Sequence, residues 1–274
     1  MHDYIEKSPD DYISYSYYYF QKTVTKLFND DIQNLGDLFN EYENIVQHLG
    51  NYERSAYLIL RCFLHYELKQ VEQMDKLVMQ IREISDDEVN NATYNQFADL
   101  CEAMQLLLSS RSKHQGRAQE LLEGIVYNDS INATTTNFAL NFLLISLIKE
   151  MANSGDLKIL EEIRFVIEKY STFANKSNSK FAKIIVEIIT AKVSIFEGDF
   201  ESYIDHINIA DAIALETTSK LFEKMVKEAK LSIEEDVEKL KDMIRDGASL
   251  KERLQIMNYN QYIESIVKYS ISGV

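Results

Sequence analysis

Histidines are the side chains in this sequence with the clearest potential to bind a metal or exchange protons. They occupy five separated positions, and no two of them lie within one helical turn. Metal sites on helices need ligands at i, i+3 or i+4, and the Glu-x-x-His motif of di-iron bundles does not occur. We therefore expect no metal site. His65, which lies in an apolar stretch, is interpreted as a partly buried histidine.

Motifs of nucleotide binding and of nucleophilic catalysis do not occur in the sequence either. It contains neither Gly-x-Gly-x-x-Gly nor Gly-x4-Gly-Lys-Ser/Thr, and it contains no Gly-x-Ser-x-Gly. Adjacent carboxylates such as Glu161 and Glu162 point about 100° apart on a helix, so we assign them to solvated faces or helix ends. The sequence predicts no catalytic residue, no cofactor and no enzymatic activity.

The two cysteines, Cys62 and Cys101, stand in separate apolar stretches and form no Cys-x-x-Cys pair. We interpret both as small buried side chains of a protein in a reducing compartment. The N-terminus is polar, without a basic-then-apolar signal segment. No run approaches the ~18 apolar residues that span a bilayer. These features predict a cytoplasmic protein without a membrane segment.

The acidic charge balance argues against two classes of partner, nucleic acids and anionic membranes. The chain has 44 acidic against 29 basic residues, a formal net charge of −15. At long range this charge repels nucleic-acid backbones and anionic membranes. We therefore expect neither nucleic acid nor a membrane surface as a partner, and a protein or peptide instead.

The elements that must carry any binding residues are helices. The sequence has one proline and eight glycines, too few for the turns of a β-sandwich or barrel of 274 residues. Apolar residues recur at helical spacing, as in Leu27–Gly50, where Gly50 is placed at a helix C-terminus. Lys220–Arg245 is predicted to be one long amphipathic helix, with Glu234 and Glu238 on its solvated side. Beyond it, Ser249 is predicted to cap a short helix with Glu252 as in a capping box.

Polar turns recur along the chain. Gly198 in Phe196–Phe200 has a counterpart at Gly155, and similar breaks occur at Lys113, Lys69 and Asn29, spaced by 40 to 44 residues. This period predicts one domain, 1–274, of stacked antiparallel hairpins that bury their faces against one another. The hairpins are expected at about 11–49, 51–84, 90–127, 132–170 and 176–214, followed by C-terminal capping helices at 216–270.

Around the Gly198 turn the repeat resembles a known family. Ala191 precedes the turn and Ala210 follows it, a spacing that resembles a tetratricopeptide repeat, in which small residues lie where two helices cross. The period here is longer than the usual ~34 residues. The resemblance implies an all-α, right-handed α-solenoid.

The C-terminal segment Glu216–Tyr269 carries a second resemblance. It is similar to the C-terminal extension of uncharacterised repeat proteins from archaea, which implies a fold and little about activity. The matching stretches are Leu221–Lys224, Glu238–Ile244, Gly247–Leu254 and Tyr262-Ile263.

If the repeat resemblance holds, one face of each first helix lines a concave groove. Aligning the hairpins on their turns places a set of aromatic, cationic and amide side chains along that face. These candidate partner-binding residues are Tyr66, Arg111, Lys149, Asn153, Lys192 and Phe196. The cations among them could hold an extended peptide with an acidic group by charge-assisted hydrogen bonds.

The aromatic stretch Tyr12–Phe20 has two interpretations. It could pack a first helix onto its neighbours, or it could be a contact with a partner or a second copy, because tyrosine combines an apolar body with a polar tip.

The sequence as a whole predicts a non-enzymatic interaction scaffold. A regulatory sensor for a small anionic ligand and a structural homodimer are the alternatives.

Overall fold

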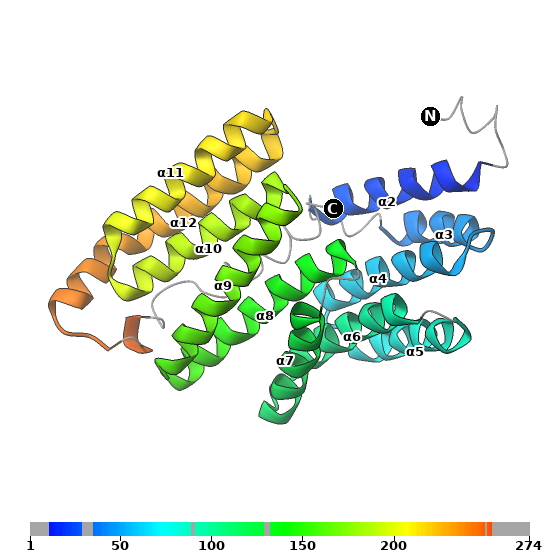
Figure 1. Cartoon of the computed structure of the whole chain (residues 1–274), viewed down its shortest axis with the longest axis horizontal. Helices are drawn as coiled ribbons and strands as arrows, with labels where there is room; N and C mark the ends of the chain where they lie inside the picture. Colours follow the sequence, from blue (N-terminus) through cyan, green and yellow to red (C-terminus); the bar gives the residue numbers. More distant parts are fainter. Residues whose placement is uncertain (1–10, 29–34, 89–90, 129–131, 250, 254–274) are drawn as a thin grey trace. The chain divides into compact units, whose positions relative to one another are not determined.

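The computed structural model describes residues 11–28, 35–88, 91–128, 132–249 and 251–253, and every regular element in these ranges is helical. The predicted all-α class is confirmed for this part of the chain (Figure 1). The principal helices are α2 (Tyr12–Phe28), α3 (Leu35–Val46), α4 (Asn51–Glu67), α5 (Val71–Asp87), α6 (Ala92–Leu107), α7 (Ser112–Tyr127), α8 (Ala133–Ser154), α9 (Lys158–Lys176), α10 (Lys180–Glu197), α11 (Phe200–Thr217) and α12 (Lys220–Arg245).

The chain divides into two compact units, residues 1–139 and 140–273, and the division falls within α8. In the first unit, α2 packs on α3 and α4, α4 also contacts α3, α5 and α6, and α6 contacts α5 and α7. In the second unit, α9 packs on α10, and α10 packs on both α11 and α12. Helices therefore pack mainly on their neighbours in sequence, as in an all-α solenoid.

The aromatic stretch of α2 packs largely inside the first unit. The Tyr19 ring stacks on Tyr42 of α3 with centroids 5.8 Å apart, and Ser16 forms a 3.1 Å hydrogen bond with the Tyr42 hydroxyl. Tyr15 is buried. Two residues of the same helix, Ile13 and Tyr17, stay on the surface with 59% and 70% of their area exposed. They lie one turn apart and therefore share a face of α2.

The core of the second unit joins α10, α11 and α12. Ala191, Ile195, Tyr203, Ile207 and Leu240 form one buried cluster, with Phe200 and Val237 packed against it. The alanines singled out by their spacing, at 191 and 210, are both fully buried. Small side chains let neighbouring helices approach closely, which suits their place in the adjoining helices α10 and α11.

Several helix ends follow the predicted turns. Lys69, Gly155 and Gly198 lie between consecutive helices, and all three have positive φ, at 55°, 71° and 85°. The long helix Lys220–Arg245 is α12. Ser249 and Glu252 form the predicted capping box, with a 2.8 Å bond from the Ser249 N–H to the glutamate and a 3.3 Å return bond from the Glu252 N–H to the serine hydroxyl.

Two predicted helix ends are wrong. Gly50 is the residue before α4, in an extended conformation with φ −71° and ψ 173°, and it does not end the preceding helix, which stops at Val46. Lys113 lies in the first turn of α7. The break lies at residues 108–111, before Lys113, and the Gln115 side chain donates a 3.1 Å hydrogen bond to the Leu107 carbonyl at the end of α6.

Some predicted features lie outside the described residues. These are the turn at Asn29 and the part of the C-terminal capping segment beyond residue 253. Among the described helices, none combines the length and the apolar character needed to cross a bilayer.

Candidate functional site: a groove between two helices

Two of the predicted binding residues belong to the first unit. Tyr66 lies near the end of α4 and is buried. Arg111 is exposed and directly precedes α7. Since Tyr66 is part of the helix packing, Arg111 is the member of this pair that is displayed to solvent.

The other four predicted residues lie in pairs on α8 and α10. Lys149 is half-buried and Asn153 is exposed, one turn apart on α8. Lys192 is only 3% exposed, and Phe196 belongs to the interior of α10. The backbone carbonyl of Phe196 accepts a 2.8 Å hydrogen bond from Arg253. Binding by these residues stays a prediction, and a surface groove is found elsewhere.

The side chains capable of metal or thiol chemistry are dispersed or buried. No group of three or more histidine, cysteine or acidic side chains within the described ranges could hold a metal ion. Cys62 and Cys101 are free and buried, as predicted. Burial raises the pKa of the Cys101 thiol, and its hydrogen bond with Cys62 adds to that effect. A buried thiol that stays protonated is a poor nucleophile.

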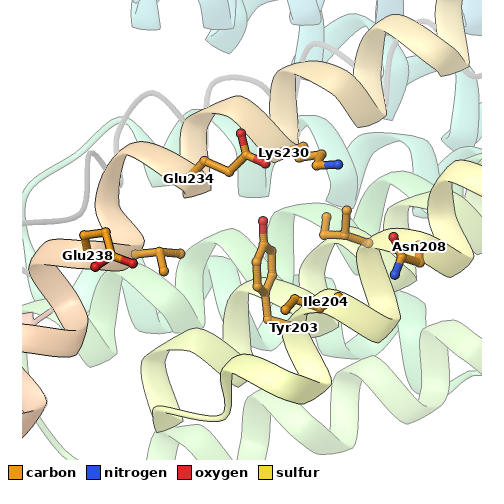
Figure 2. A pocket seen from close by; sticks show the side chains of 8 residues that line it. Tyr203, Ile204, Asn208, Lys230, Glu234 and Glu238 are labelled. Atoms are coloured by element: carbon orange, nitrogen blue, oxygen red, sulfur yellow. The ribbon is translucent and has the colours of Figure 1, made fainter.

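The groove lies between α11 and α12 and has a volume of about 390 Å³ (Figure 2). This size falls within the range of ligand sites in proteins, about 300–1,000 Å³. One wall comes from α11 and the other from α12. The lining residues are Tyr203, Ile204, Ile207 and Asn208 of α11 and Lys230, Glu234, Val237 and Glu238 of α12.

The base of the groove is formed by apolar residues that also belong to the core of the second unit or pack against it. Tyr203 and Ile207 are buried members of that cluster, and Val237 packs against it. Ile204, one residue beyond Tyr203, leaves the core and is 54% exposed. The groove therefore has an apolar base on rigid helices and an exposed aliphatic side chain on one wall.

The turn between α10 and α11 fixes where the first wall begins. The N–H groups of Gly198 and Asp199 donate to the carbonyls of Ile195 (3.0 Å) and Ser194 (2.8 Å), the pattern of a Schellman motif. Asp199 then caps α11 by accepting from the Ser202 N–H at 3.0 Å. These bonds satisfy the backbone at the junction and set the direction of α11.

The second wall is positioned against the same turn. A side chain at Gly198 would come within 3.1 Å of the Ile244 Cδ1 atom, so the end of α12 packs closely on this glycine. At the other end of the pair, Thr218 has φ 53° and separates α11 from α12. Both ends of the groove are thereby held by tight turns or close packing.

Two carboxylates and one ammonium group line the second wall. Glu234 and Glu238 lie one turn apart, with Lys230 one turn before Glu234. Glu238 forms a 2.8 Å ion pair with Lys241, and both partners are largely exposed. No ion pair joins Glu234 to any cation within the described part of the chain. Glu234 is the groove carboxylate best placed to accept an external donor.

Tyr203 adds a hydroxyl group to the groove. In Figure 2 its hydroxyl points from α11 toward the wall of α12 that carries Glu234 and Lys230. Burial raises the pKa of Tyr203, and the charge of Glu234 raises it further. The phenol therefore stays protonated at neutral pH, where it can donate or accept a hydrogen bond.

This groove is not among the sites predicted from the sequence. Glu234 and Glu238 were assigned to a solvated helix face, because periodicity shows which side of α12 is polar but not what lies opposite. The signal that could have found the groove is Ile204. It lies 100° around α11 from the buried Tyr203, so an aliphatic side chain stands at the border of the buried face of this 18-residue helix.

The described lining of the groove combines an apolar base with two carboxylates, one ammonium group and one phenol. Comparison with protein-family models, with curated proteins and with solved structures finds no match for this chain.

Proposed function

We propose that this chain is a non-enzymatic interaction scaffold that binds a peptide or protein segment in the groove between α11 and α12. The observation that carries the proposal is the exposed Ile204 in the same groove as Glu234, on an apolar base. An exposed aliphatic side chain gains free energy when a partner covers it, about 25 cal/mol per Å² of apolar area. The carboxylate beside it supplies direction and specificity.

The proposal extends to the architecture that presents the groove. The hairpins would stack as a right-handed, tetratricopeptide-like solenoid in the cytoplasm. The full burial of Ala191 and Ala210 in adjoining helices supports such close helix crossings. Among the six residues predicted from the sequence, the exposed Arg111 and Asn153 would remain candidate contacts, each on its own unit.

A sensor for a small anionic ligand is less well supported at this groove. An anion near Lys230 would lie on a wall that also carries Glu234 and Glu238. The net charge of the whole protein, −15, also opposes the approach of an anion. A structural homodimer has a specific observation in its favour, the exposed Ile13 and Tyr17 on one face of α2.

The test compares two isoleucines of α11. Ile204 and Ile209 are 54% and 45% exposed, but only Ile204 lines the groove. We expect Ile204→Asp to lose a partner captured from an extract of the native cells, while Ile209→Asp retains it at the level of the unmodified chain. Capture is quantified by mass spectrometry, after circular dichroism has shown equal helix content for both variants.

Retention of the same partners by both variants would refute binding in this groove. Failure of the unmodified chain to retain any protein above a tag-only control would refute the scaffold itself. Loss in both variants would show that an aspartate on the exposed surface of α11 disturbs binding wherever it stands, and would also count against the groove.

A further inference from the structure

The geometry points to one class of occupant: we infer that the α11–α12 groove recognises a protein segment in which a lysine or arginine stands beside an aliphatic residue. This inference rests on the proposed function and names its partner class. Its first ground is the balance of charge on the wall of α12. Two carboxylates and a single ammonium group line the groove, and because Glu238 is paired with Lys241, Glu234 is the carboxylate that attracts a cation.

Helix geometry explains why Glu234 is open to an external cation. Lys230 precedes it by four residues, and this order, with the lysine toward the N-terminus, is the weaker arrangement of an i, i+4 pair. Accordingly, no described ion pair joins the two. The glutamate one turn further on, Glu238, already shares its charge with Lys241. The partner's basic group is thus expected at Glu234, with Glu238 contributing at longer range.

Lys241 itself is held away from Glu234. Its ammonium group lies 2.8 Å from Glu238 and 5.6 Å from the centre of the Phe200 ring. A cation placed between a carboxylate and an aromatic ring has two favourable contacts. This arrangement leaves the middle of the groove, between Glu234 and Tyr203, for a group from outside.

The apolar base fits the rest of a basic side chain. Lysine and arginine have aliphatic stems that lie along apolar surface while the charged head stays at a polar edge. In the groove the stem would lie over Ile207 and Val237, and the head would reach Glu234 and the Tyr203 hydroxyl. A neighbouring aliphatic residue of the segment would cover Ile204, which is 54% exposed.

The field of the whole chain favours the same occupant. With a net charge of −15 the protein attracts a basic segment before contact and raises its association rate, chiefly at low ionic strength. The same field suppresses acidic segments. Charge and shape therefore select for an aliphatic residue next to a basic one.

The experiment uses a random peptide library displayed on phage and selected on the full-length chain. Selections run in parallel on Ile204→Asp, on Glu234→Lys and on Glu228→Lys, a charge reversal on the same helix outside the groove lining. Glu228 and Lys224 form a 3.7 Å ion pair, and both side chains are about half exposed. Because exposed pairs contribute little to stability, the reversal of Glu228 should have little effect on stability. Peptides recovered by the unmodified chain are then synthesised, and their affinities are measured by fluorescence polarisation.

We expect the unmodified chain and Glu228→Lys to enrich peptides with a lysine or arginine adjacent to an aliphatic residue. Their affinity for Glu234→Lys should be about tenfold lower, since the reversal replaces an attraction with a repulsion. Glu234→Lys should itself lose the enrichment of basic peptides. Added salt should weaken binding to the unmodified chain.

Two kinds of result distinguish a failure of the inferred peptide preference from a failure of the proposed groove. Peptides that depend on Ile204 but show no preference for basic residues, or bind Glu234→Lys equally well, would overturn the inference and leave the proposed function standing. Peptides recovered equally by Ile204→Asp, or no enrichment at all, would overturn both, because the groove would then not be a peptide site.

Discussion

At the scale of single residues, buried tyrosines carry much of the specificity of the fold. Tyr42 is 1% exposed, and its ring lies 5.1 Å from that of Tyr57 in an edge-on arrangement. Tyr170, fully buried, accepts a 2.8 Å hydrogen bond from Asn141. A tyrosine inside a core requires a partner for its hydroxyl, so each of these bonds favours one packing arrangement over others.

The first prediction concerns the alkaline stability of the protein through Tyr42. Burial raises the pKa of Tyr42 to about 12, above its ordinary value of 10.0. Between these pH values the unfolded chain loses the phenolic proton while the folded chain keeps it. The free energy of unfolding should therefore fall as pH rises from about 10 to 12, by at most about 1.4 kcal/mol per pH unit for this group.

Urea unfolding followed by circular dichroism at several alkaline pH values would measure this slope. Tyr42→Phe should start from a lower stability, since it loses the bond with Ser16, but should show a shallower decline with pH. The exposed Tyr17→Phe serves as the control and should leave the slope unchanged. A slope in Tyr42→Phe as steep as in the unmodified chain would contradict the assignment.

At the scale of helices, the junctions decide how the elements meet. Gly198 combines a φ of 85° with close contact to Ile244 of α12. Only glycine adopts this left-handed conformation without strain. Gly124, by contrast, lies within α7 with no atom near the position of an added Cβ. Gly198 is required by its turn, whereas Gly124 is not required by its helix. Substitution by alanine should therefore change the stability of the protein in opposite directions at the two positions.

We predict that Gly198→Ala destabilises the protein by about 1–3 kcal/mol, because it adds backbone strain and forces Ile244 to move. Gly124→Ala should stabilise it by about 0.5–1 kcal/mol, because alanine loses less conformational entropy in a helix. Urea midpoints of the two variants would decide. Equal shifts of the same sign would show that the Gly198 turn carries no special constraint.

Helices were predictable from the sequence where apolar residues recur at helical spacing on one face and polar residues occupy the other. The bounds of α12 and the capping box of Ser249 and Glu252 follow from spacing and chemistry that are local to each element. Gly50 was misplaced because glycine suits both ends of a helix, and only its backbone angles tell which end it occupies.

The groove and the burial of Lys192, one of the predicted cations, could not be derived in the same way. Lys192 has the polar identity of a surface residue, yet α10 is covered on several sides and leaves it only 3% exposed. Periodicity assigns a side chain to a face of its own helix. It does not say which other helix, if any, covers that face, and the α11–α12 groove depends on that information.

At the scale of the whole molecule, the net charge of −15 acts on every encounter of the protein. Two copies of the chain repel each other at low ionic strength, whereas a basic partner is attracted. Salt shortens the reach of both effects, from about 30 Å at 0.01 M to about 8 Å at 0.15 M. Self-association and partner binding should therefore respond to salt in opposite directions.

This opposition gives a test of the homodimer through the exposed Ile13 and Tyr17 of α2. If that face mediates a dimer, sedimentation velocity should show the dimer fraction rising with salt, and Tyr17→Glu should stay monomeric throughout. A dimer that dissociates on addition of salt, or that survives Tyr17→Glu, would contradict this interface. A monomer under all conditions would exclude the homodimer.

The packing of each helix on its neighbours in sequence also has a consequence for how the chain is made. Contacts between near neighbours close only short loops, so little chain entropy is lost before they form, and such topologies fold fast. During synthesis the ribosome releases residues one after another, from the N-terminus. An early helix of either unit therefore finds its partner as soon as the next helix emerges, and its apolar face is exposed to aggregation only for the time needed to translate one hairpin.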